Sequence, residues 1–353
     1  MSHTVTILGA GAMGTALTTP ALAGGHRVRL WGTSLDTDIL AVIRRDEQHP
    51  RLGLRVDRAV ATYSAEDLPD ALEGADLVVL AISSDGALDI AGQAADHLRA
   101  GTPVLVTTKG FGRDGDGAVA LFPPLLREVI GADIPLIVAG GPCKANEVAA
   151  GDPTATTYAS DESAALRRVA SMLATDSYRI EPSSDVVGVE ITAAMKNVYA
   201  IALGICDGLG DAAGSPRHNL KSAVFARALR EMRSLSDALG GDPATVYGLP
   251  GAGDLEVTGL SGRNKVYGAR IGAGERPRAA LTVMHRAGQT VEGAAALPLA
   301  AELGTALQAT DRLAPDALPL LAALGRILDD GVDPQHTLAE ASLPGRSQVS
   351  APA

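Results

Sequence analysis

Apolar residues in the first half of the chain gather in short runs, separated by stretches in which they recur at helical spacing. The runs that predict strands are 4–8, 26–31, 77–81, 103–107 and 135–139, with 155–159 and 178–181 as weaker candidates. A glycine-rich turn and a helix through about residue 23 follow the first run. Short strands alternating with helices predict βαβ units, and their continuous valine, leucine and isoleucine content predicts a parallel sheet covered on both faces.

After about residue 183 the strand-like runs end and helical spacing dominates. The predicted helices are 187–203, 220–239, 263–272, 279–287, 294–303 and 315–329. We therefore expect an α/β N-terminal domain over residues 1–183 and an all-helical C-terminal domain over 184–340, a division that the length of 353 residues also favours. Residues 341–353 are rich in proline, serine and glycine and are expected to form a flexible tail.

Charge and composition exclude several classes of protein. A formal net charge of −11 argues against a nucleic-acid surface, although it leaves room for a small anionic ligand. Cys143 and Cys206 have no metal-ligand spacing, and neither has any group of His, Asp and Glu, so we expect no disulfide framework and no metal. The N-terminus leads straight into an apolar strand without a basic leader, which predicts a cytoplasmic protein.

The most apolar long run, 187–203, is long enough to raise the question of a membrane span. It contains Glu190, Lys196 and Asn197, polar groups that would be costly in lipid. We therefore expect a buried helix of a globular domain and no membrane insertion.

The clearest motif comes directly after the first predicted strand. Gly9, Gly11 and Gly14 form the pattern G-x-G-x-x-G and open a helix. The first glycine permits a tight turn, the second lets the backbone approach a pyrophosphate, and the third allows close packing of the helix on the sheet. We therefore predict a dinucleotide site at Gly9, Gly11, Ala12, Met13 and Gly14, within a Rossmann-type doubly wound parallel sheet.

The end of the second predicted strand bears on the choice of cofactor. An acid commonly stands there and holds the ribose 2′-hydroxyl of NAD. Here the strand ends in Trp31, Thr33 and Ser34 follow, and the first acid is Asp36. Small hydroxyl residues leave room for a 2′-phosphate, so we expect NADP or NAD, with NADP slightly preferred, and contacts from Trp31, Thr33 and Ser34. The nearest arginines, at 44–45, are more typical of an exposed helix surface.

Two lysines stand where packing alone would not place them. Lys109 follows the strand 103–107, at the edge of a parallel sheet where ligands bind, although a solvated loop lysine would fit the same pattern. Lys196, next to Asn197, interrupts the apolar helix. Burial lowers the pKa of a lysine and suits it to acid–base catalysis, while a lysine that extends to solvent is the alternative.

A third group of polar residues lies further along. Asp254, which directly follows the segment Gly251-Ala252-Gly253, can orient a catalytic lysine or cap a helix, and its sequence spacing does not decide between these roles. Thr258, Arg263 and Asn264 bring hydroxyl, guanidinium and amide donors together. The planar guanidinium binds phosphate in a bidentate manner, whereas an exposed arginine of no special function is the alternative.

Taken in order, these segments resemble the bacterial NAD(P)-dependent glycerol-3-phosphate dehydrogenases. The matching segments are GAGAMG (9–14), TTKG (107–110), GGPCKANE (140–147), GVEITAAMKNVYAIALGICDGLG (188–210), GLPGAGDLEVTG (248–259), GRN (262–264) and QTVEG (289–293). The resemblance runs from the first strand to about residue 305. It implies reversible hydride transfer between NAD(P)H and dihydroxyacetone phosphate, which gives sn-glycerol 3-phosphate for glycerophospholipid synthesis by a homodimer.

The same resemblance implies roles for individual residues. Lys196 would be the acid–base group, Lys109 would orient or polarise the substrate, and Asp254 would orient Lys196. The residues implied on the substrate side are Lys109, Cys143, Thr258, Arg263 and Asn264. Those implied on the cofactor side, besides the glycine-rich turn and the end of the second strand, are Lys109, Ala145, Arg263 and Glu292.

Departures from the family pattern keep other functions open. The family commonly has a small hydroxyl or amide group at Cys143 and an apolar or aromatic residue at Lys144, which here would contact a phosphate or point to solvent. Residues 82–84 also differ, and 210–219 predicts a longer loop than usual. One alternative is therefore a paralogous dehydrogenase acting on a different small phosphorylated or phosphonate ketone or alcohol. Another is a sensor that binds NADP without redox chemistry, which the retained lysines and Asp254 disfavour.

Overall fold

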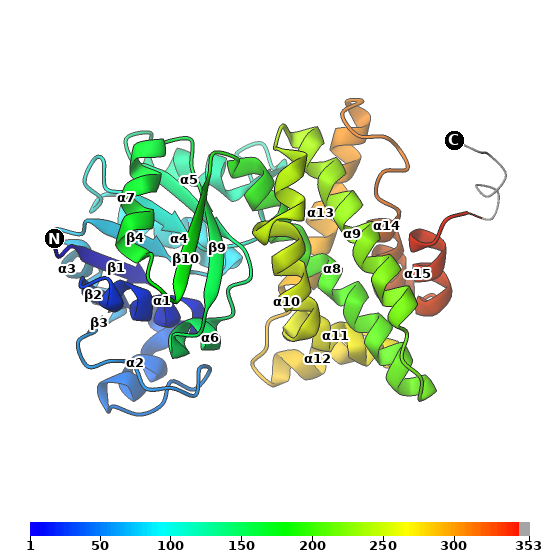
Figure 1. Ribbon diagram of the computed structural model, residues 1–353, viewed down its shortest axis with the longest axis horizontal. Helices are drawn as coiled ribbons and strands as arrows, with labels where there is room; N and C mark the ends of the chain where they lie inside the picture. Colours follow the sequence, from blue (N-terminus) through cyan, green and yellow to red (C-terminus); the bar gives the residue numbers. More distant parts are fainter. Residues whose placement is uncertain (346–353) are drawn as a thin grey trace. The chain divides into compact units, whose positions relative to one another are not determined.

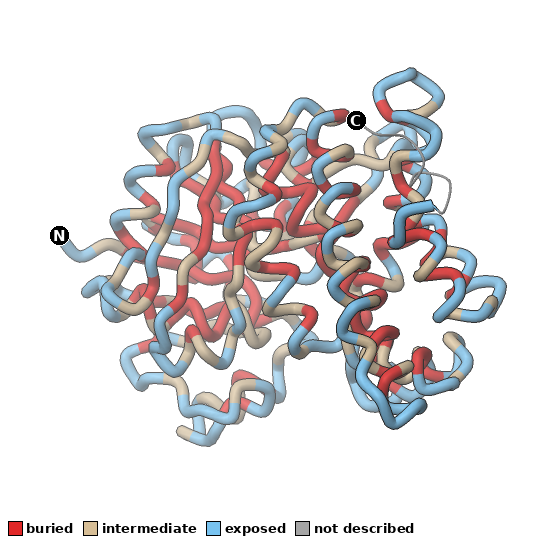
Figure 2. The backbone as a smooth tube through the Cα atoms, turned by 45° about the vertical axis from the view of Figure 1, so that its right-hand side comes forward, coloured by how far each residue is buried: buried red, intermediate tan, exposed pale blue. Residues whose placement is uncertain are grey.

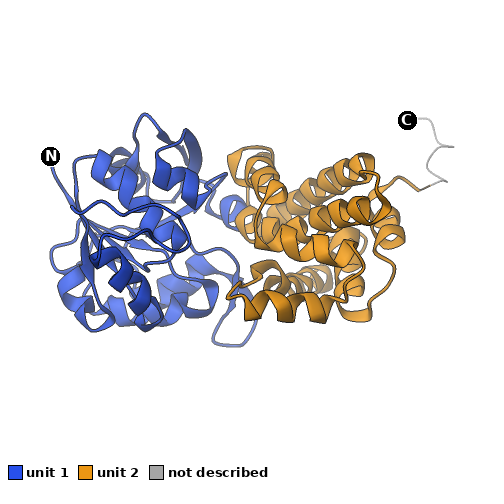
Figure 3. Ribbon diagram, turned by 90° about the horizontal axis from the view of Figure 1, so that it is seen from below, with its two compact units in different colours: residues 1–190 blue, residues 191–353 orange. Residues whose placement is uncertain are grey.

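The computed structural model describes residues 1–345 and divides the chain into two compact units, Met1–Glu190 and Ile191–Ala353 (Figure 3). The first unit is a helix-covered sheet, and residues 191–345 contain helices and no strand. The expected fold class, a Rossmann-type α/β domain followed by a helical domain, is confirmed. The predicted boundary, between residues 183 and 184, lies just before α8 (Val186–Ala213), the helix within which the two units divide.

The first unit alternates strands and helices along most of its length (Figure 1). Its strands are β1 (Thr4–Leu8), β2 (Arg27–Trp31), β3 (Ala61–Tyr63), β4 (Leu77–Leu80), β5 (Val104–Val106), β6 (Phe111–Arg113), β7 (Val119–Leu121), β8 (Leu136–Gly140), β9 (Thr154–Ala159) and β10 (Tyr178–Ser183). Its helices are α1 (Ala12–Ala23), η1 (Ser34–Asp36), α2 (Thr37–Arg44), η2 (Ala65–Asp67), α3 (Leu68–Leu72), α4 (Ser84–Ala95), α5 (Phe122–Ile130), α6 (Ala145–Ala150) and α7 (Ser163–Leu173). Every strand expected from an apolar run is present. The sequence did not predict β3, β6 and β7, because none of these three-residue strands lies in one of the apolar runs.

The order of the main sheet is β10-β9-β8-β5-β4-β1-β2-β3. The chain runs outward from β1 through β2 to β3, then returns to the other side of β1 as β4. In doubly wound sheets such a reversal of strand order marks the ligand-binding edge. The pairs are parallel except β8 with β9, because the short helix α6 turns the chain back in the opposite direction. Strands β6 and β7 form a separate antiparallel hairpin.

The core of the first unit lies on both faces of the sheet. Along β4, Leu77 and Val79 pack into one apolar cluster, whereas Val78 and Leu80 pack into the cluster on the other face. Successive side chains of a strand point to opposite faces, so both faces are covered, as the continuous apolar runs predict. Figure 2 shows buried residues along the strands and exposed residues on the outer helices and loops.

The second unit is a set of helices. They are the remainder of α8, α9 (His218–Leu239), η3 (Pro243–Tyr247), η4 (Leu249–Gly253), α10 (Asp254–Leu260), α11 (Arg263–Gly272), α12 (Pro277–Arg286), α13 (Glu292–Ala309), α14 (Pro319–Gly325), η5 (Arg326–Asp330) and α15 (Pro334–Ser342). By length and composition α8 would suffice to cross a membrane, yet 89% of its most apolar 18-residue window is buried. Within the described residues it is therefore a core helix, as expected for the run 187–203.

Glycines bring α8 and α11 into backbone contact. A Cβ at Gly204 or Gly208 of α8 would lie 2.1 or 2.0 Å from carbonyl oxygens of α11. Conversely, a Cβ at Gly268 or Gly272 of α11 would lie 2.0 or 2.1 Å from carbonyl oxygens of α8. Each helix therefore presents two glycines four residues apart, on one face, to the backbone of the other. This contact fixes the position of the polar residues at the start of α11 against α8.

A buried carboxylate joins three helices of the same unit. Glu231 of α9 accepts hydrogen bonds from the backbone N–H groups of Leu320 and Leu321, at 2.6 and 3.0 Å, and from the hydroxyl of Tyr199, at 2.8 Å. It thereby satisfies the free N–H groups at the start of α14. Burial raises the pKa of Glu231 to about 7 against the lowering effect of these bonds.

Two expectations about loops require correction. The segment 210–219 is not a long loop, because α8 continues to Ala213 and α9 begins at His218. Gly214, with a φ of +61°, ends the first helix in the left-handed conformation and leaves a short connection. The expected tail, 341–353, begins inside α15, where Ala341 and Ser342 are buried, and its residues 346–353 lie outside the described residues.

Candidate functional site

The glycine-rich turn lies between the ends of β1 and β4, where the strand order reverses. Gly9 has a φ of +109°, and a Cβ there would lie 2.6 Å from the carbonyl oxygen of Ala81. A Cβ at Gly14 would lie 2.0 Å from the carbonyl oxygen of Gly9, so helix and turn are in backbone contact. At Gly11, by contrast, a Cβ would meet no atom within 4 Å, and no side chain caps the start of α1. The turn therefore offers open space and helix N–H groups to an anion, which fits a pyrophosphate.

The end of β2 differs from its sequence-based interpretation. Asp36 folds back, and its Oδ2 accepts hydrogen bonds from the N–H and the hydroxyl of Thr33, both at 3.0 Å. The same oxygen lies 3.4 Å from the amide nitrogen of Ala10 in the glycine-rich turn. An acid therefore does stand beside the turn, although it comes five residues after the strand. The signal was the spacing Thr-x-x-Asp, a capping box.

Trp31 and Ser34, both expected to contact the cofactor, differ in burial. The Trp31 side chain is 1% exposed, and its Nε1 donates to the carbonyl of Ala65, so the indole belongs to the core. Its carbonyl accepts a hydrogen bond from the amide of Gly9, in the turn, at 2.8 Å. Ser34 is exposed at the start of η1. The arginines at 44–45 donate to hydroxyls and to a carboxylate on the surface, as expected for helix-surface residues.

Lys109 lies in the loop that follows β5, at the same edge of the sheet. Thr108 donates to the carbonyl of Ile82 at 2.8 Å, and this bond ties the loop to the end of β4. Gly110 has a φ of +141°, which lets the chain turn sharply after Lys109.

Glu190 is a feature that sequence reasoning did not select as functional. Its side chain is 1% exposed, and within residues 1–345 neither carboxylate oxygen has a hydrogen-bond partner. Burial raises the pKa of Glu190 to about 8, and the positive charge of Lys109 acts in the opposite direction. A carboxyl group with such a pKa is largely protonated at pH 7. The sequence signal was an acid at a buried position of an apolar helix.

Cys143, Lys144 and Ala145 follow β8 at this edge. The Cys143 sulfur is 3.7 Å from the hydroxyl of Tyr178, which is 3.1 Å from that of Tyr158. Burial raises the pKa of both tyrosines. Lys144 lies 3.6 Å from a carboxylate oxygen of Glu147, one helical turn further on, and is half-exposed. Ala145 is the first residue of α6 and is partly buried.

In the second unit, Lys196 and Asp254 form a buried ion pair. Lys196 Nζ is 2.5 Å from Asp254 Oδ1 and donates to the hydroxyl of Thr258 at 3.1 Å. Asp254 is 1% exposed and Lys196 is 8% exposed. Asp254 begins α10, and its carboxylate contacts Lys196. Gly251, three residues before Asp254, packs against the backbone of η3, because a Cβ there would lie 2.0 Å from the carbonyl oxygen of Val246.

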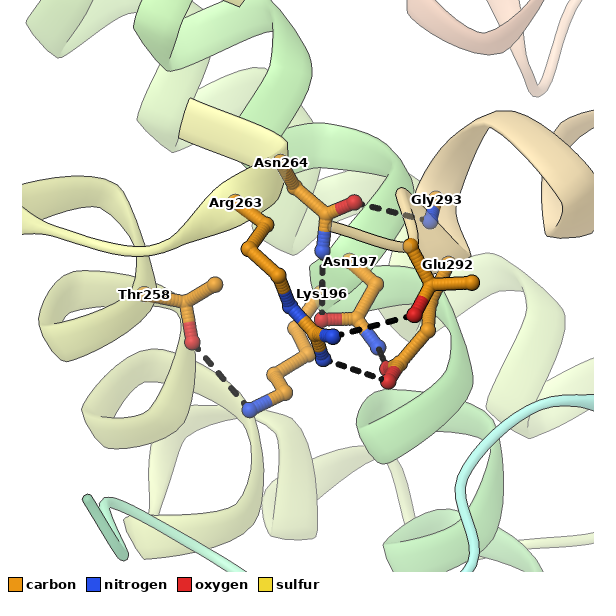
Figure 4. A network of polar contacts seen from close by, with 8 residues as sticks. Lys196, Asn197, Thr258, Arg263, Asn264, Glu292 and Gly293 are labelled. Carbon is orange, nitrogen blue, oxygen red and sulfur yellow. Dashed lines mark hydrogen bonds and ion pairs between the residues drawn. The ribbon is translucent and has the colours of Figure 1, made fainter. Parts of the chain in front are cut away.

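A chain of amide hydrogen bonds begins at Asn197, the neighbour of Lys196 (Figure 4). Asn264 donates through Nδ2 to Asn197 Oδ1 at 3.0 Å and accepts through Oδ1 from the amide of Gly293 at 2.8 Å. Asn197 in turn donates to Glu292 Oε2 at 3.0 Å. The other oxygen of Glu292 pairs with Arg263 at 2.9 Å. Lys196 and Asn197, consecutive on α8, are thus held by residues from α10, α11 and α13.

The network leaves its outer end accessible. The side chain of Arg263 is 43% exposed and that of Glu292 is 35% exposed, whereas Asn197 and Asn264 are buried. Arg263 also donates to the hydroxyl of Thr290 at 3.1 Å. Gly293 packs directly on α8, since a Cβ there would lie 2.2 Å from the carbonyl oxygen of Asn197. The arrangement combines a buried ammonium and buried amides with a partly exposed guanidinium and carboxylate.

The chain combines a glycine-rich turn, at the strand-order reversal of a doubly wound sheet, with a buried lysine–aspartate pair. These two features define the class of protein. It is that of the oxidoreductases that use a nicotinamide dinucleotide.

Comparison with known proteins identifies the family. The model of the NAD-dependent glycerol-3-phosphate dehydrogenase N-terminus matches residues 4–166, and that of the C-terminus matches 185–339. The chain is 34% identical over 344 residues to NADP(+)-dependent glycerol-3-phosphate dehydrogenase of Archaeoglobus fulgidus, covering 95% of this chain and 98% of the relative. It is 37% identical over 338 residues to glycerol-3-phosphate dehydrogenase [NAD(P)+] of Nitrosomonas eutropha, covering 92% and 97%.

Solved structures agree with these relatives. The crystal structure of glycerol-3-phosphate dehydrogenase from Coxiella burnetii matches with a TM-score of 0.82 and 29% identity, covering 97% of this chain and 99% of that one. The chain belongs to the NAD-dependent glycerol-3-phosphate dehydrogenase family, which confirms the resemblance drawn from its motifs.

Proposed function

We propose that this chain catalyses the reversible reduction of dihydroxyacetone phosphate to sn-glycerol 3-phosphate with NADPH or NADH. The observation that carries the proposal is the buried pair of Lys196 and Asp254, with Thr258 beside it, in a member of this family. A buried ammonium needs a partner, and here the partner also fixes its position.

The first unit would hold the dinucleotide. The open backbone at Gly11 and the N–H groups at the start of α1, from Ala12 and Met13, suit the pyrophosphate. Thr33 and Asp36 lie beside the turn where a ribose would be held. When bound, the nicotinamide supplies or accepts the hydride.

The position of Asp36 changes the argument about cofactor preference. The preference for NADP rested on small hydroxyl residues and on the distance of the nearest acid. The Thr33 hydroxyl is already bonded to Asp36, and a carboxylate repels a 2′-phosphate. We therefore propose that both cofactors are used, without the slight preference for NADP.

Lys196 would move the proton. Hydride addition to a carbonyl carbon develops negative charge on the oxygen, and a positioned ammonium both stabilises that charge and protonates it. Asp254 holds Nζ in place from one side and Thr258 from another. In the oxidative direction the same nitrogen accepts the hydroxyl proton.

The remaining polar residues suit the anionic end of the substrate. Arg263 and Asn264, at the start of α11, are the donors we assign to the phosphate. Lys109, at the edge of the sheet, is assigned to orienting the substrate, and Cys143 to its surroundings. We also propose, on the family resemblance, that the enzyme is a cytoplasmic homodimer supplying glycerophospholipid synthesis.

The test is oxidation of NADPH and of NADH against a panel of ketones. The panel contains dihydroxyacetone phosphate, its phosphonate analogue, other small phosphorylated ketones, and dihydroxyacetone without phosphate. We expect dihydroxyacetone phosphate to be the best substrate and the unphosphorylated ketone to be the poorest. Rapid turnover of another anion, with negligible turnover of dihydroxyacetone phosphate, would instead establish the paralogous dehydrogenase.

A further inference from the structure

The segment between α2 and β3 closes on itself. Gln48 and Arg55 form an isolated antiparallel bridge, and the amide of His49 donates to the carbonyl of Leu54 at 2.8 Å. Gly53, with a φ of +69°, turns the chain, and its amide donates to the carbonyl of His49 at 2.9 Å. The segment is therefore a compact loop with its own hydrogen bonds, and the His49 side chain, 0% exposed, is buried beneath it.

Both nitrogens of the His49 ring have hydrogen-bond partners. The amide of Arg51 donates to Nδ1 at 3.2 Å, and Nε2 lies 3.1 Å from the carbonyl oxygen of Ala10. An amide N–H only donates, so Nδ1 must be the acceptor and carry no proton. The proton then resides on Nε2, which donates to the Ala10 carbonyl. The ring is thus fixed as one neutral tautomer, in keeping with burial, which lowers the pKa of His49.

Ala10 is the second residue of the glycine-rich turn, and it is itself 0% exposed. Its carbonyl oxygen also accepts from the hydroxyl of Thr15 at 3.2 Å, and its amide nitrogen is 3.4 Å from Asp36. The Ala10 carbonyl and the Gly11 N–H belong to one planar trans peptide and point in opposite directions. A partner that holds the carbonyl toward His49 therefore directs the Gly11 N–H to the other side of the turn.

We propose that His49 is a positioning residue for the dinucleotide, which holds the Ala10 carbonyl and so presets the N–H groups of the turn for the pyrophosphate. The inference rests on the proposed use of a nicotinamide dinucleotide. It assigns a function in cofactor binding to a loop residue 39 positions away from the turn. Preset donors bind an anion more tightly because no reorientation is needed on binding.

Two substitutions of His49 distinguish the hydrogen bond made by Nε2 from the one made by Nδ1. In His49→Gln the terminal amide nitrogen can reach the place of Nε2 and donate to Ala10, whereas in His49→Asn the shorter side chain keeps an acceptor near Arg51 and cannot reach Ala10. We expect His49→Asn to raise the Kd for NADPH and NADH about tenfold, the effect of one lost buried hydrogen bond. We expect His49→Gln to stay within about threefold of wild type. In both variants kcat should change less than KM for the cofactor.

Arg58→Gln is the matched control, because Arg58 lies in the same loop, pairs with Asp46 on the surface and has an 83% exposed side chain. It should leave the cofactor Kd unchanged. If the loop merely contributed to stability, the substitutions at His49 would lower the melting temperature, but the Asn and Gln variants would not differ in cofactor affinity.

Equal cofactor affinity in wild type, His49→Asn and His49→Gln would overturn the inference, and so would equal weakening in both variants. Should His49→Asn not fold, hydrogen exchange of the wild-type enzyme decides. Coupling is reciprocal, so bound NADPH must slow exchange of the Arg51 amide, and an unchanged rate would overturn the inference. A wild-type chain that binds neither NADPH nor NADH would contradict the proposed function and, with it, this inference.

Discussion

The glycine contact between α8 and α11 leads to a sharp prediction about Gly268→Ala. The added Cβ would lie 2.0 Å from the carbonyl oxygen of Ile201, about 1.4 Å closer than ordinary contact. Since the obstacle is backbone, the two helices must move apart. Asn264 lies four residues before Gly268 on α11, as Asn197 does before Ile201 on α8, so the separation acts on the hydrogen bond between the two asparagines. At 3.0 Å this bond cannot lengthen by about 1 Å and persist.

The expected cost follows from the same geometry. Overpacking of this kind destabilises by about 1–3 kcal/mol, and loss of a buried amide bond adds about 1 kcal/mol. For a unit of this size a loss of about 3 kcal/mol lowers the melting temperature by roughly 6–12 °C. Because Asn197 is next to Lys196, we expect the turnover number to fall at least tenfold even at temperatures where the variant is folded.

Gly325→Ala is the control for Gly268→Ala. Gly325 is also helical, with φ −55° and ψ −52°, but a Cβ there would meet no atom within 4 Å. This variant should be as stable as wild type or more stable by about 0.4–1 kcal/mol, with unchanged activity. Thermal unfolding followed by circular dichroism and NADPH oxidation at 25 °C measure both properties. A Gly268→Ala variant that melts and turns over like Gly325→Ala would refute the close helix contact.

Three further substitutions test separate parts of the structure. Asp254→Asn leaves the Lys196 ammonium buried without its counter-charge, so thermal unfolding should show a loss of about 3–5 kcal/mol, and steady-state kinetics a lower kcat, whereas unchanged values would contradict the pair. Gly14→Ala places a Cβ 2.0 Å from the Gly9 carbonyl oxygen and should abolish NADPH binding in calorimetry; retained affinity would show that the turn is not held as described. Burial raises the pKa of Glu231 from 4.5 to about 7, so protonation favours the folded state, and denaturant unfolding should show stability falling by about 3 kcal/mol between pH 4.5 and pH 7. In Glu231→Gln that part of the pH dependence should vanish, and its persistence would assign it to another group.

Local pattern was enough to predict most of the fold. Apolar runs located the strands that form the centre of the sheet, and the G-x-G-x-x-G motif located the turn between β1 and β4. The wrong or missing predictions concern segments whose local sequence pattern does not determine their structure. Glycine and proline in the segment 210–219 are typical of loops, yet its first residues continue α8. The hairpin of β6 and β7 is held by three residue pairs, which leave no periodicity to detect.

The sequence allowed the residues of the candidate site to be identified, but it did not predict which of them contact one another. Lys196, Asp254 and Thr258 could be named from their motifs, because a lysine in an apolar helix and an acid directly after a Gly-x-Gly segment are unusual. Their contacts span 58 and 62 residues along the chain, and no local pattern specifies such pairs.

Asp36 and His49 escaped selection for the same reason. Each reaches the glycine-rich turn only because a short loop folds back on it.

The role of Lys196 can be tested by single-turnover hydride transfer from NADPH to dihydroxyacetone phosphate, measured for wild type and for Lys196→Met. Methionine has a similar volume and flexibility and carries no proton to donate. We expect rapid transfer in wild type, a rate at least about a hundredfold lower in Lys196→Met, and an unchanged Kd for NADPH. Transfer at the wild-type rate in Lys196→Met would contradict the claim that this buried lysine moves the proton.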